Sequence, residues 1–110
     1  MLAFEDPMTK TRLSSSELEK ICGAFKKVFP PNDQLWLFGS KVDLSAKGGD
    51  IDLYIETGFD ISKVVELELQ FSKELFYKLD DRKIDVVIRY KDAPDALIYD
   101  VAKKTGVRIL

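Results

Sequence analysis

Two aspartates separated by a single residue, Asp50 and Asp52, are the side chains of this chain that point most directly to chemistry. They open an apolar run, and because side chains alternate between the two faces of a strand, both carboxylates are expected on one face. Two like charges on one face repel each other unless a cation lies between them. Carboxylate oxygens suit Mg²⁺, which proteins hold through one or two carboxylates and substrate phosphates. Gly49, directly before the pair, leaves the backbone open to a ligand.

A glycine–serine turn, Gly39 and Ser40, follows an earlier apolar run and precedes the aspartate pair. Small residues of this kind let the backbone approach a phosphate closely. Lys41 is placed to reach a phosphate, although a solvated surface lysine is the alternative, and a glycine–serine pair after a strand is also ordinary turn chemistry. The spacing between the turn and the aspartate pair is what makes this segment a candidate for phosphate binding.

A third acid, Asp85, lies in the alternating segment 83–89. Its neighbours Ile84 and Val86 are expected to face the core, so Asp85 projects from the opposite face. If the strands that carry Asp52 and Asp85 are neighbours, three carboxylates converge on one face of a sheet. The alternatives stay open: a solvent-facing strand for the aspartate pair and a plain surface position for Asp85.

The apolar periodicity predicts helices and strands in alternation, which favours an α/β-type sheet covered by helices. Ser14 and Glu17 fit a capping box at the start of the first helix, and Asp60 fits the N-cap of a long second helix. Tyr54 and Glu56 share the expected face of Asp52, where they could be exposed strand residues. The expected elements are a helix from Ser14 to Pro30, strands at 34–38 and 50–56, a short helix or turn at 40–47, a helix at 61–79, a strand at 83–89, a helix from Pro94 to Thr105 capped by Gly106 at C′, and a short strand at 107–110.

Length and composition exclude several classes of function. The 110 residues predict one domain, with an irregular N-terminal segment at 1–13 and a folded domain at 14–110. The chain contains no histidine, which excludes Ser-His-Asp and Cys-His triads, and the lone Cys22 excludes an intramolecular disulfide. The net charge of −2 gives no overall attraction to nucleic acid or to a membrane, so we expect neither as a partner. Without a long apolar segment, the cytoplasm is the expected location.

The combination of Gly39-Ser40, a spacer of about ten residues, Asp50-Ile51-Asp52 and a later Asp85 resembles the motif of the DNA-polymerase-β-type nucleotidyltransferase superfamily. The resemblance is to its smallest form, the minimal nucleotidyltransferase (MNT) domains, and it covers residues 14–110. One departure is visible. The family commonly has Arg-Ala-Arg-Gly after the glycine–serine pair, whereas this chain has Lys-Val-Asp-Leu from Lys41 onward, a difference that bears on phosphate contacts by this segment.

The resemblance implies a fold and a mechanism. The fold would be α/β (α+β), a mixed β-sheet flanked by helices with the acids at one end. Asp50 and Asp52 would hold Mg²⁺ on the triphosphate of ATP, and Asp85 would complete a second Mg²⁺ site and help to activate the attacking hydroxyl. The nucleotide-binding residues would be Gly39, Ser40, Lys41 and Gly49.

Larger members of the superfamily carry a further domain for the acceptor, and 110 residues leave no room for one. Stand-alone minimal domains resemble the antitoxin of HEPN–MNT toxin–antitoxin pairs, which implies a helical HEPN ribonuclease as partner and transfer of AMP to a tyrosine hydroxyl on it. Two alternatives remain: an antibiotic-type small-molecule nucleotidyltransferase, which would need a second domain or a homo-oligomer to form its pocket, and a non-catalytic module that neutralises a partner by contact alone.

Overall fold

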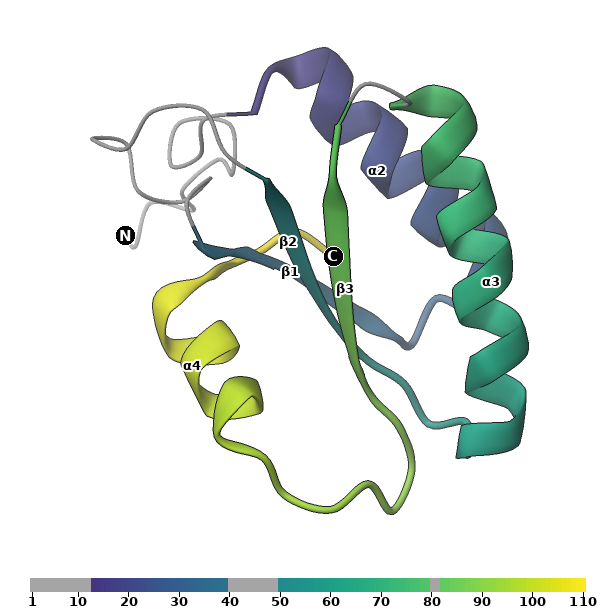
Figure 1. Ribbon diagram of the computed structural model, residues 1–110, viewed down its shortest axis with the longest axis vertical. Coiled ribbons are helices and arrows are strands. Elements are labelled where there is room, and N and C mark those ends of the chain that lie inside the picture. The colour runs from purple at the N-terminus through teal and green to yellow at the C-terminus, as the bar shows by residue number, and fades with distance from the viewer. Residues whose placement is uncertain (1–12, 40–49, 80–81) are drawn as a thin grey trace.

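A four-stranded mixed sheet with helices on both faces makes up the fold (Figure 1). The computed structural model describes residues 13–39, 50–79 and 82–110, so the element considered for 40–47 lies outside the described residues. Helices α2 and α3 cover one face of the sheet and α4 covers the other, which confirms the predicted α/β (α+β) mixed sheet flanked by helices. The elements are α2 (Ser15–Val28), β1 (Gln34–Phe38), β2 (Ile51–Glu56), α3 (Ile61–Lys78), β3 (Ile84–Arg89), α4 (Leu97–Thr105) and β4 (Val107–Arg108).

The strand order is β3-β2-β1-β4. β1 runs antiparallel to both β2 and β4, whereas β2 and β3 run parallel and are connected through α3, as parallel neighbours require a crossover. β2 lies between β3 and β1, and its high apolar content suits this central position. Strand alternation is also as expected, since Ile84 and Val86 pack on the α2–α3 side while Val87 packs on the α4 side.

Local side chains define where α2 and α3 begin. At α2 the Glu17 amide donates to Ser14 Oγ (3.1 Å) and the Ser14 amide donates to Glu17 Oε1 (3.0 Å), which confirms the capping box. At α3 the Lys63 amide donates to Asp60 Oδ1 (3.2 Å), as predicted for an N-cap. No helix in the described parts of the chain is both long and apolar enough to cross a membrane.

The bounds of α4 differ from the prediction. The helix begins at Leu97 and not at Pro94-Asp95, because Asp95 Oδ1 accepts from Arg89 (3.0 Å) and caps nothing, and Ala96 offers no capping side chain. Gly106 is the C-cap in extended conformation and not a left-handed C′ residue. It is small for another reason: a Cβ there would lie 2.7 Å from the Leu37 carbonyl oxygen, so glycine allows the chain to turn tightly against β1.

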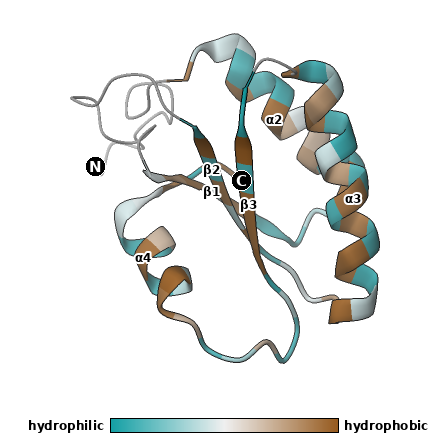
Figure 2. Cartoon of the chain, in the orientation of Figure 1, coloured by the Kyte–Doolittle hydropathy of each residue, from teal (hydrophilic) through white to brown (hydrophobic). Residues whose placement is uncertain are grey.

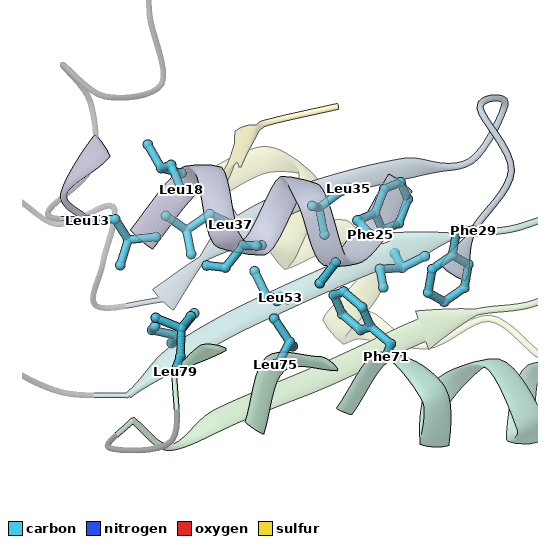
Figure 3. Packing of buried hydrophobic residues seen from close by; sticks show 14 of the residues in the cluster. Leu13, Leu18, Phe25, Phe29, Leu35, Leu37, Leu53, Phe71, Leu75 and Leu79 are labelled. Carbon is cyan, nitrogen blue, oxygen red and sulfur yellow. The ribbon is translucent and has the colours of Figure 1, made fainter. Parts of the chain in front are cut away.

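Two apolar clusters hold the layers together. The larger lies between the sheet and the α2–α3 layer, where the fully buried Phe71 meets Phe25 and Phe29 edge to face at centroid distances of 6.2 and 5.6 Å (Figure 3). The smaller lies under α4 and contains Trp36, Phe38, Tyr54 and Ala102. Both clusters share the sheet, so β1 and β2 are buried on both faces.

Replacing Phe71 by alanine should lower the free energy of unfolding by about 3–5 kcal/mol, because it removes a buried ring that two other rings contact. Urea denaturation followed by circular dichroism measures the change. Tyr77→Ala is the control, since Tyr77 lies on the same helix with its side chain exposed, and its loss should cost less than about 0.5 kcal/mol. Equal losses for the two variants would contradict the assigned packing of α3.

Candidate functional site

The three predicted acids gather at one edge of the sheet, which we call the acidic edge (Asp50, Asp52 and Asp85). Since β1 is antiparallel to β2, the end of β1 meets the beginning of β2, and Asp52 pairs with Phe38. On its other side Asp52 pairs in register with Asp85, because β3 runs parallel to β2. The condition set by the sequence, that the strands of Asp52 and Asp85 be neighbours, is therefore met.

Electrostatic repulsion acts on the carboxyl of Asp52. Partial burial raises the pKa of the Asp52 carboxyl above its usual value, and the nearby negative charges of Asp85 and then Asp50 raise it further. Lys83 acts in the opposite direction. The ionised form of Asp52 is thus disfavoured in the protein alone, and a cation placed among these carboxylates would relieve the repulsion.

Lys83 is a member of this edge that the sequence reasoning did not single out. Its Nζ lies 3.7 Å from Asp50 Oδ2, and its carbonyl oxygen accepts from the Ile51 amide (3.0 Å), which joins the starts of β2 and β3. The side chain is largely exposed, so the ion pair adds little to stability. The available signal was its place two residues before Asp85, which puts both residues on the same strand face.

Gly39 lies directly against the acidic edge. It follows β1 with a φ of +76°, a conformation that favours glycine. A Cβ at this position would collide with the carboxylate of Asp52 and would lie 3.0 Å from its Cγ. The predicted glycine is therefore required twice, for its backbone conformation and for the close approach of Asp52.

Three predicted site residues, Ser40, Lys41 and Gly49, lie outside the described residues, so their assignment to nucleotide binding stays a prediction. Within the described ranges, no three His, Cys, Asp or Glu side chains lie close enough together to enclose a metal ion. The acidic edge is thus an open row of carboxylates and not a closed protein cage.

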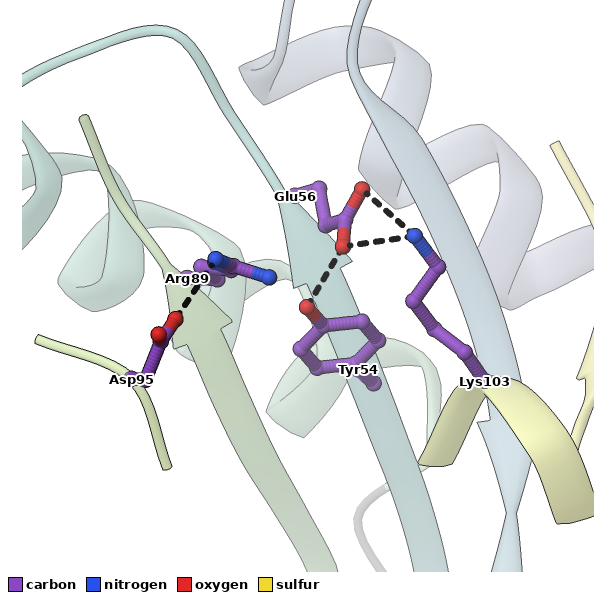
Figure 4. Close-up of polar contacts among 5 residues, drawn as sticks. All are labelled: Tyr54, Glu56, Arg89, Asp95 and Lys103. Atoms are coloured by element: carbon purple, nitrogen blue, oxygen red, sulfur yellow. Dashed lines mark hydrogen bonds and ion pairs between the residues drawn. The ribbon is translucent and has the colours of Figure 1, made fainter. Parts of the chain in front are cut away.

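The far end of the same sheet face has a structural role. Tyr54 is fully buried, its hydroxyl donates to Glu56 Oε2 (2.7 Å), and Lys103 of α4 pairs with the same carboxylate at 3.2 Å (Figure 4). Burial, and then the bond to Glu56, raise the pKa of Tyr54, so the phenol stays protonated. The suggestion that Tyr54 is an exposed strand residue is therefore wrong, because α4 covers this part of β2.

A pocket of about 500 Å³ also lies at that far end, lined by Asp33, Glu56 and Thr57 among others. Glu56 lies four positions after Asp52 along β2, a distance of about 13 Å. Because none of the three acids lines this pocket, cavity size and charged chemistry point to opposite ends of the sheet. We place the candidate site at the acidic edge, since the repelling carboxylates and the constrained Gly39 are found there.

Comparisons with known proteins bear on the fold. No family model and no curated protein matches the sequence. Among solved structures, a chain of the toxin–antitoxin MntA-HpeT, in a mutant form, aligns with a TM-score of 0.57 at 17% identity, covering 84% of this chain and 71% of that chain. The chain has an MNT-like fold.

A second solved structure agrees with this MNT-like assignment. It is the complex of tri-AMPylated Shewanella oneidensis HEPN toxin with MNT antitoxin, which aligns with a TM-score of 0.55 at 20% identity, covering 86% of this chain and 69% of that chain. In the MntA-HpeT mutant, two aspartates that are two residues apart are replaced by glutamate. At these identities the likeness establishes the fold, which confirms the architecture implied by the sequence motif.

Gly39→Ala should destabilise the chain by about 1–2 kcal/mol or more. An alanine is strained in the left-handed backbone conformation of this position, and its Cβ would also collide with the Asp52 carboxylate. Thermal and urea unfolding measure this loss. The matched control is Gly58→Ala, where a new Cβ meets nothing within 4 Å and little change is expected. A Gly39→Ala variant as stable as the control would contradict the described contact.

Asp52→Asn should raise the unfolding midpoint at pH 7. A carboxyl whose pKa is raised on folding reduces stability above that pKa, and the reduction disappears below the ordinary aspartate value. The advantage of the variant should therefore shrink as the pH falls through about 4. Urea titrations across pH test this, with Asp100→Asn on the exposed side of α4 as a control that gains nothing. A gain that persists in acid would point to a cause other than charge repulsion.

Proposed function

We propose that this chain is a Mg²⁺-dependent nucleotidyltransferase of the cytoplasm that transfers AMP from ATP to a hydroxyl on a partner protein. The observation that carries the proposal is the register of the sheet, which sets Asp52 beside Asp85 and next to Gly39 on an MNT-like fold. The fold depends on the whole backbone, whereas the site depends on three side chains and Gly39.

The donors of the acidic edge fit Mg²⁺. Asp50 and Asp52 offer hard carboxylate oxygens, and burial, followed by the charges of Asp85 and Asp50, raises the pKa of Asp52, so an added cation is favoured. An open row of carboxylates also suits this ion, since Mg²⁺ typically completes its shell with waters and substrate phosphates. Asp50 and Asp52 would hold the metal, with Asp85 beside them; when bound, the metal would supply positive charge to the triphosphate oxygens.

The chain's own residues would then position the reactants. Gly39 brings the backbone close enough for a phosphate to approach, and Ser40 and Lys41 follow it directly in the sequence. The attacking hydroxyl oxygen forms a bond to the α-phosphorus, and the bond from the α-phosphorus to its bridging oxygen breaks. Pyrophosphate leaves, and the hydroxyl proton passes to a carboxylate of the acidic edge, a role we assign to Asp85.

The partner we propose is a helical HEPN toxin, modified on a tyrosine, with this chain acting as its antitoxin. The support is that both solved neighbours are toxin–antitoxin pairs and that one contains a tri-AMPylated toxin. The acidic edge is open in the described part of the chain, as a site that receives a side chain from another protein must be. The alternative of neutralisation by contact alone is decided by the experiments below.

Isothermal titration should show ATP binding that depends on Mg²⁺ and is lost in Asp50→Asn/Asp52→Asn. The reason is that both carboxylates are needed to bring the metal to the triphosphate. Asp100→Asn, an exposed acid of α4, should bind as the wild type does. Equal affinity with and without Mg²⁺ in all variants would remove the metal site.

Incubation with the toxin and ATP labelled at the α-phosphate should label the toxin, whereas label at the γ-phosphate should leave with pyrophosphate. Asp85→Asn should slow transfer by about 10²-fold or more while the chain still binds ATP, because a group that accepts the proton contributes about this much. Toxin neutralisation in cells is measured in parallel. If Asp50→Ala abolishes transfer but still neutralises the toxin fully, the antitoxin acts by contact, and the proposal that AMP transfer neutralises the toxin is overturned.

A further inference from the structure

The outer edge of β3 is open in the described part of the chain, because β3 is the first strand in the order β3-β2-β1-β4. Its odd-numbered residues face β2: the carbonyl oxygens of Lys83 and Arg89 accept from β2-side amides at 3.0 and 3.1 Å. Backbone groups alternate in direction along a strand. The amides and carbonyls of the even-numbered residues therefore point outward, away from β2; these are Ile84, Val86 and Ile88.

Helix α3, which packs beside β3, exposes a row of apolar side chains that we call the apolar stripe. Ile61, Val65 and Leu69 recur every four residues, and Phe76 follows two turns later, so the four side chains share one side of the helix. Leu69 and Phe76 are 69% and 65% exposed. Figure 2 shows hydrophobic residues along both α3 and β3. An amphipathic helix that packs on one layer alone would carry polar residues here.

The stripe and the strand edge meet at Phe76, and we call them together the β3–α3 flank (β3, Ile61, Val65, Leu69 and Phe76). A pocket of about 150 Å³ joins them, lined by Ser72 and Phe76 from the helix and by Ile84 and Val86 from the strand. The opposite side of α3 is occupied, since Glu74 pairs with Lys27 of α2. Only the side of α3 next to the strand edge presents the stripe.

We propose that the β3–α3 flank binds a second copy of this chain, with β3 pairing antiparallel to β3 across a two-fold axis at Val87. Both parts of the flank suit such an axis. The strand offers the same row of outward amides and carbonyls to its mate, and the two α3 stripes, which lie on the same side of the sheet, meet antiparallel. One sheet then runs through both copies, and no open β3 edge remains.

The charges on β3 select this register. An axis at Val87 places Asp85 of each copy opposite Arg89 of the other, so that opposite charges face each other across the strands. An axis at Val86 would instead place Asp85 opposite Val87 and lose this pairing, whereas Lys83, just before β3, faces a cation with either axis, Arg89 in one case and Lys91 in the other. The axis at Val87 also pairs Val86 with Ile88, two residues whose backbone groups point outward, as an antiparallel ladder requires.

Sedimentation velocity over a concentration series is the first test. The wild type should show a monomer–dimer equilibrium, and Leu69→Glu should raise the dissociation constant at least about tenfold, because each copy would bury an unpaired charge. Leu97→Glu is the matched control, since Leu97 is an exposed leucine on α4, and it should leave the equilibrium unchanged. Val86→Pro should also block association while the fold remains, since an edge strand tolerates proline where the amide faces outward.

A cysteine at the axis tests the register. In a Cys22→Ser background, Val87→Cys should form a disulfide-linked dimer on mild oxidation, because directly opposed residues in a non-hydrogen-bonded pair lie about 4.5 Å apart, within disulfide reach. Leu97→Cys should not cross-link. A wild type that stays monomeric at every concentration overturns the proposal. The proposal is also overturned if Leu69→Glu loses binding to the toxin while the wild type stays monomeric, because the flank would then bind another protein. These readouts need no catalysis, so they are independent of the proposed transferase activity.

Discussion

The register of β2 is the constraint on which the rest of the structure depends. Ile51, Leu53 and Ile55 are fully buried against the α2–α3 layer, and this orientation leaves Asp52 and Tyr54 on the opposite face. A register shift of one residue would move every side chain of the strand to the opposite face. The same register therefore buries the apolar residues and places Asp52 on the other face. The hydrophobic energy that holds β2 in register is what keeps Asp52 beside another carboxylate.

At the acidic edge, burial of the apolar core therefore holds carboxylates close together although they repel one another. Gly39 in a left-handed conformation lies against Asp52, and the carboxyl of Asp52 is shifted toward protonation by burial and by its acidic neighbours. Strain and like charges together are common at functional sites, where a ligand completes the electrostatics. At the other end of the same face, Tyr54, Glu56 and Lys103 satisfy one another and fasten α4 to the sheet. On this one face of β2, Tyr54 and Glu56 stabilise the fold, whereas Asp52 belongs to the candidate site.

The β3–α3 flank is a surface of the described chain at which apolar side chains and a strand edge are exposed. β2 is buried on both faces, whereas Ile84, Val86 and Ile88 of β3 are only partly covered, and the helix beside them exposes further apolar side chains. A small domain has too little chain to cover every edge of its sheet. If a second copy completes this flank, Asp85 becomes a shared residue, facing the acidic edge of its own copy and Arg89 of the other.

The sequence by itself determined the local features of this protein. Capping residues placed the beginnings of α2 and α3, and alternation assigned the faces of β2 and β3, because both depend on residues close together in the chain. It predicted the beginning of α4 too early and an exposed Tyr54, whereas Asp95 bonds to Arg89 and does not cap the helix, and α4 covers Tyr54 from a distant part of the chain. Only the tertiary structure decided that Asp52 and Asp85 stand in register, that Lys83 joins them and that Gly39 touches Asp52. These relations depend on which strands become neighbours, and strand neighbours are selected by burial of the whole core and not by any single segment.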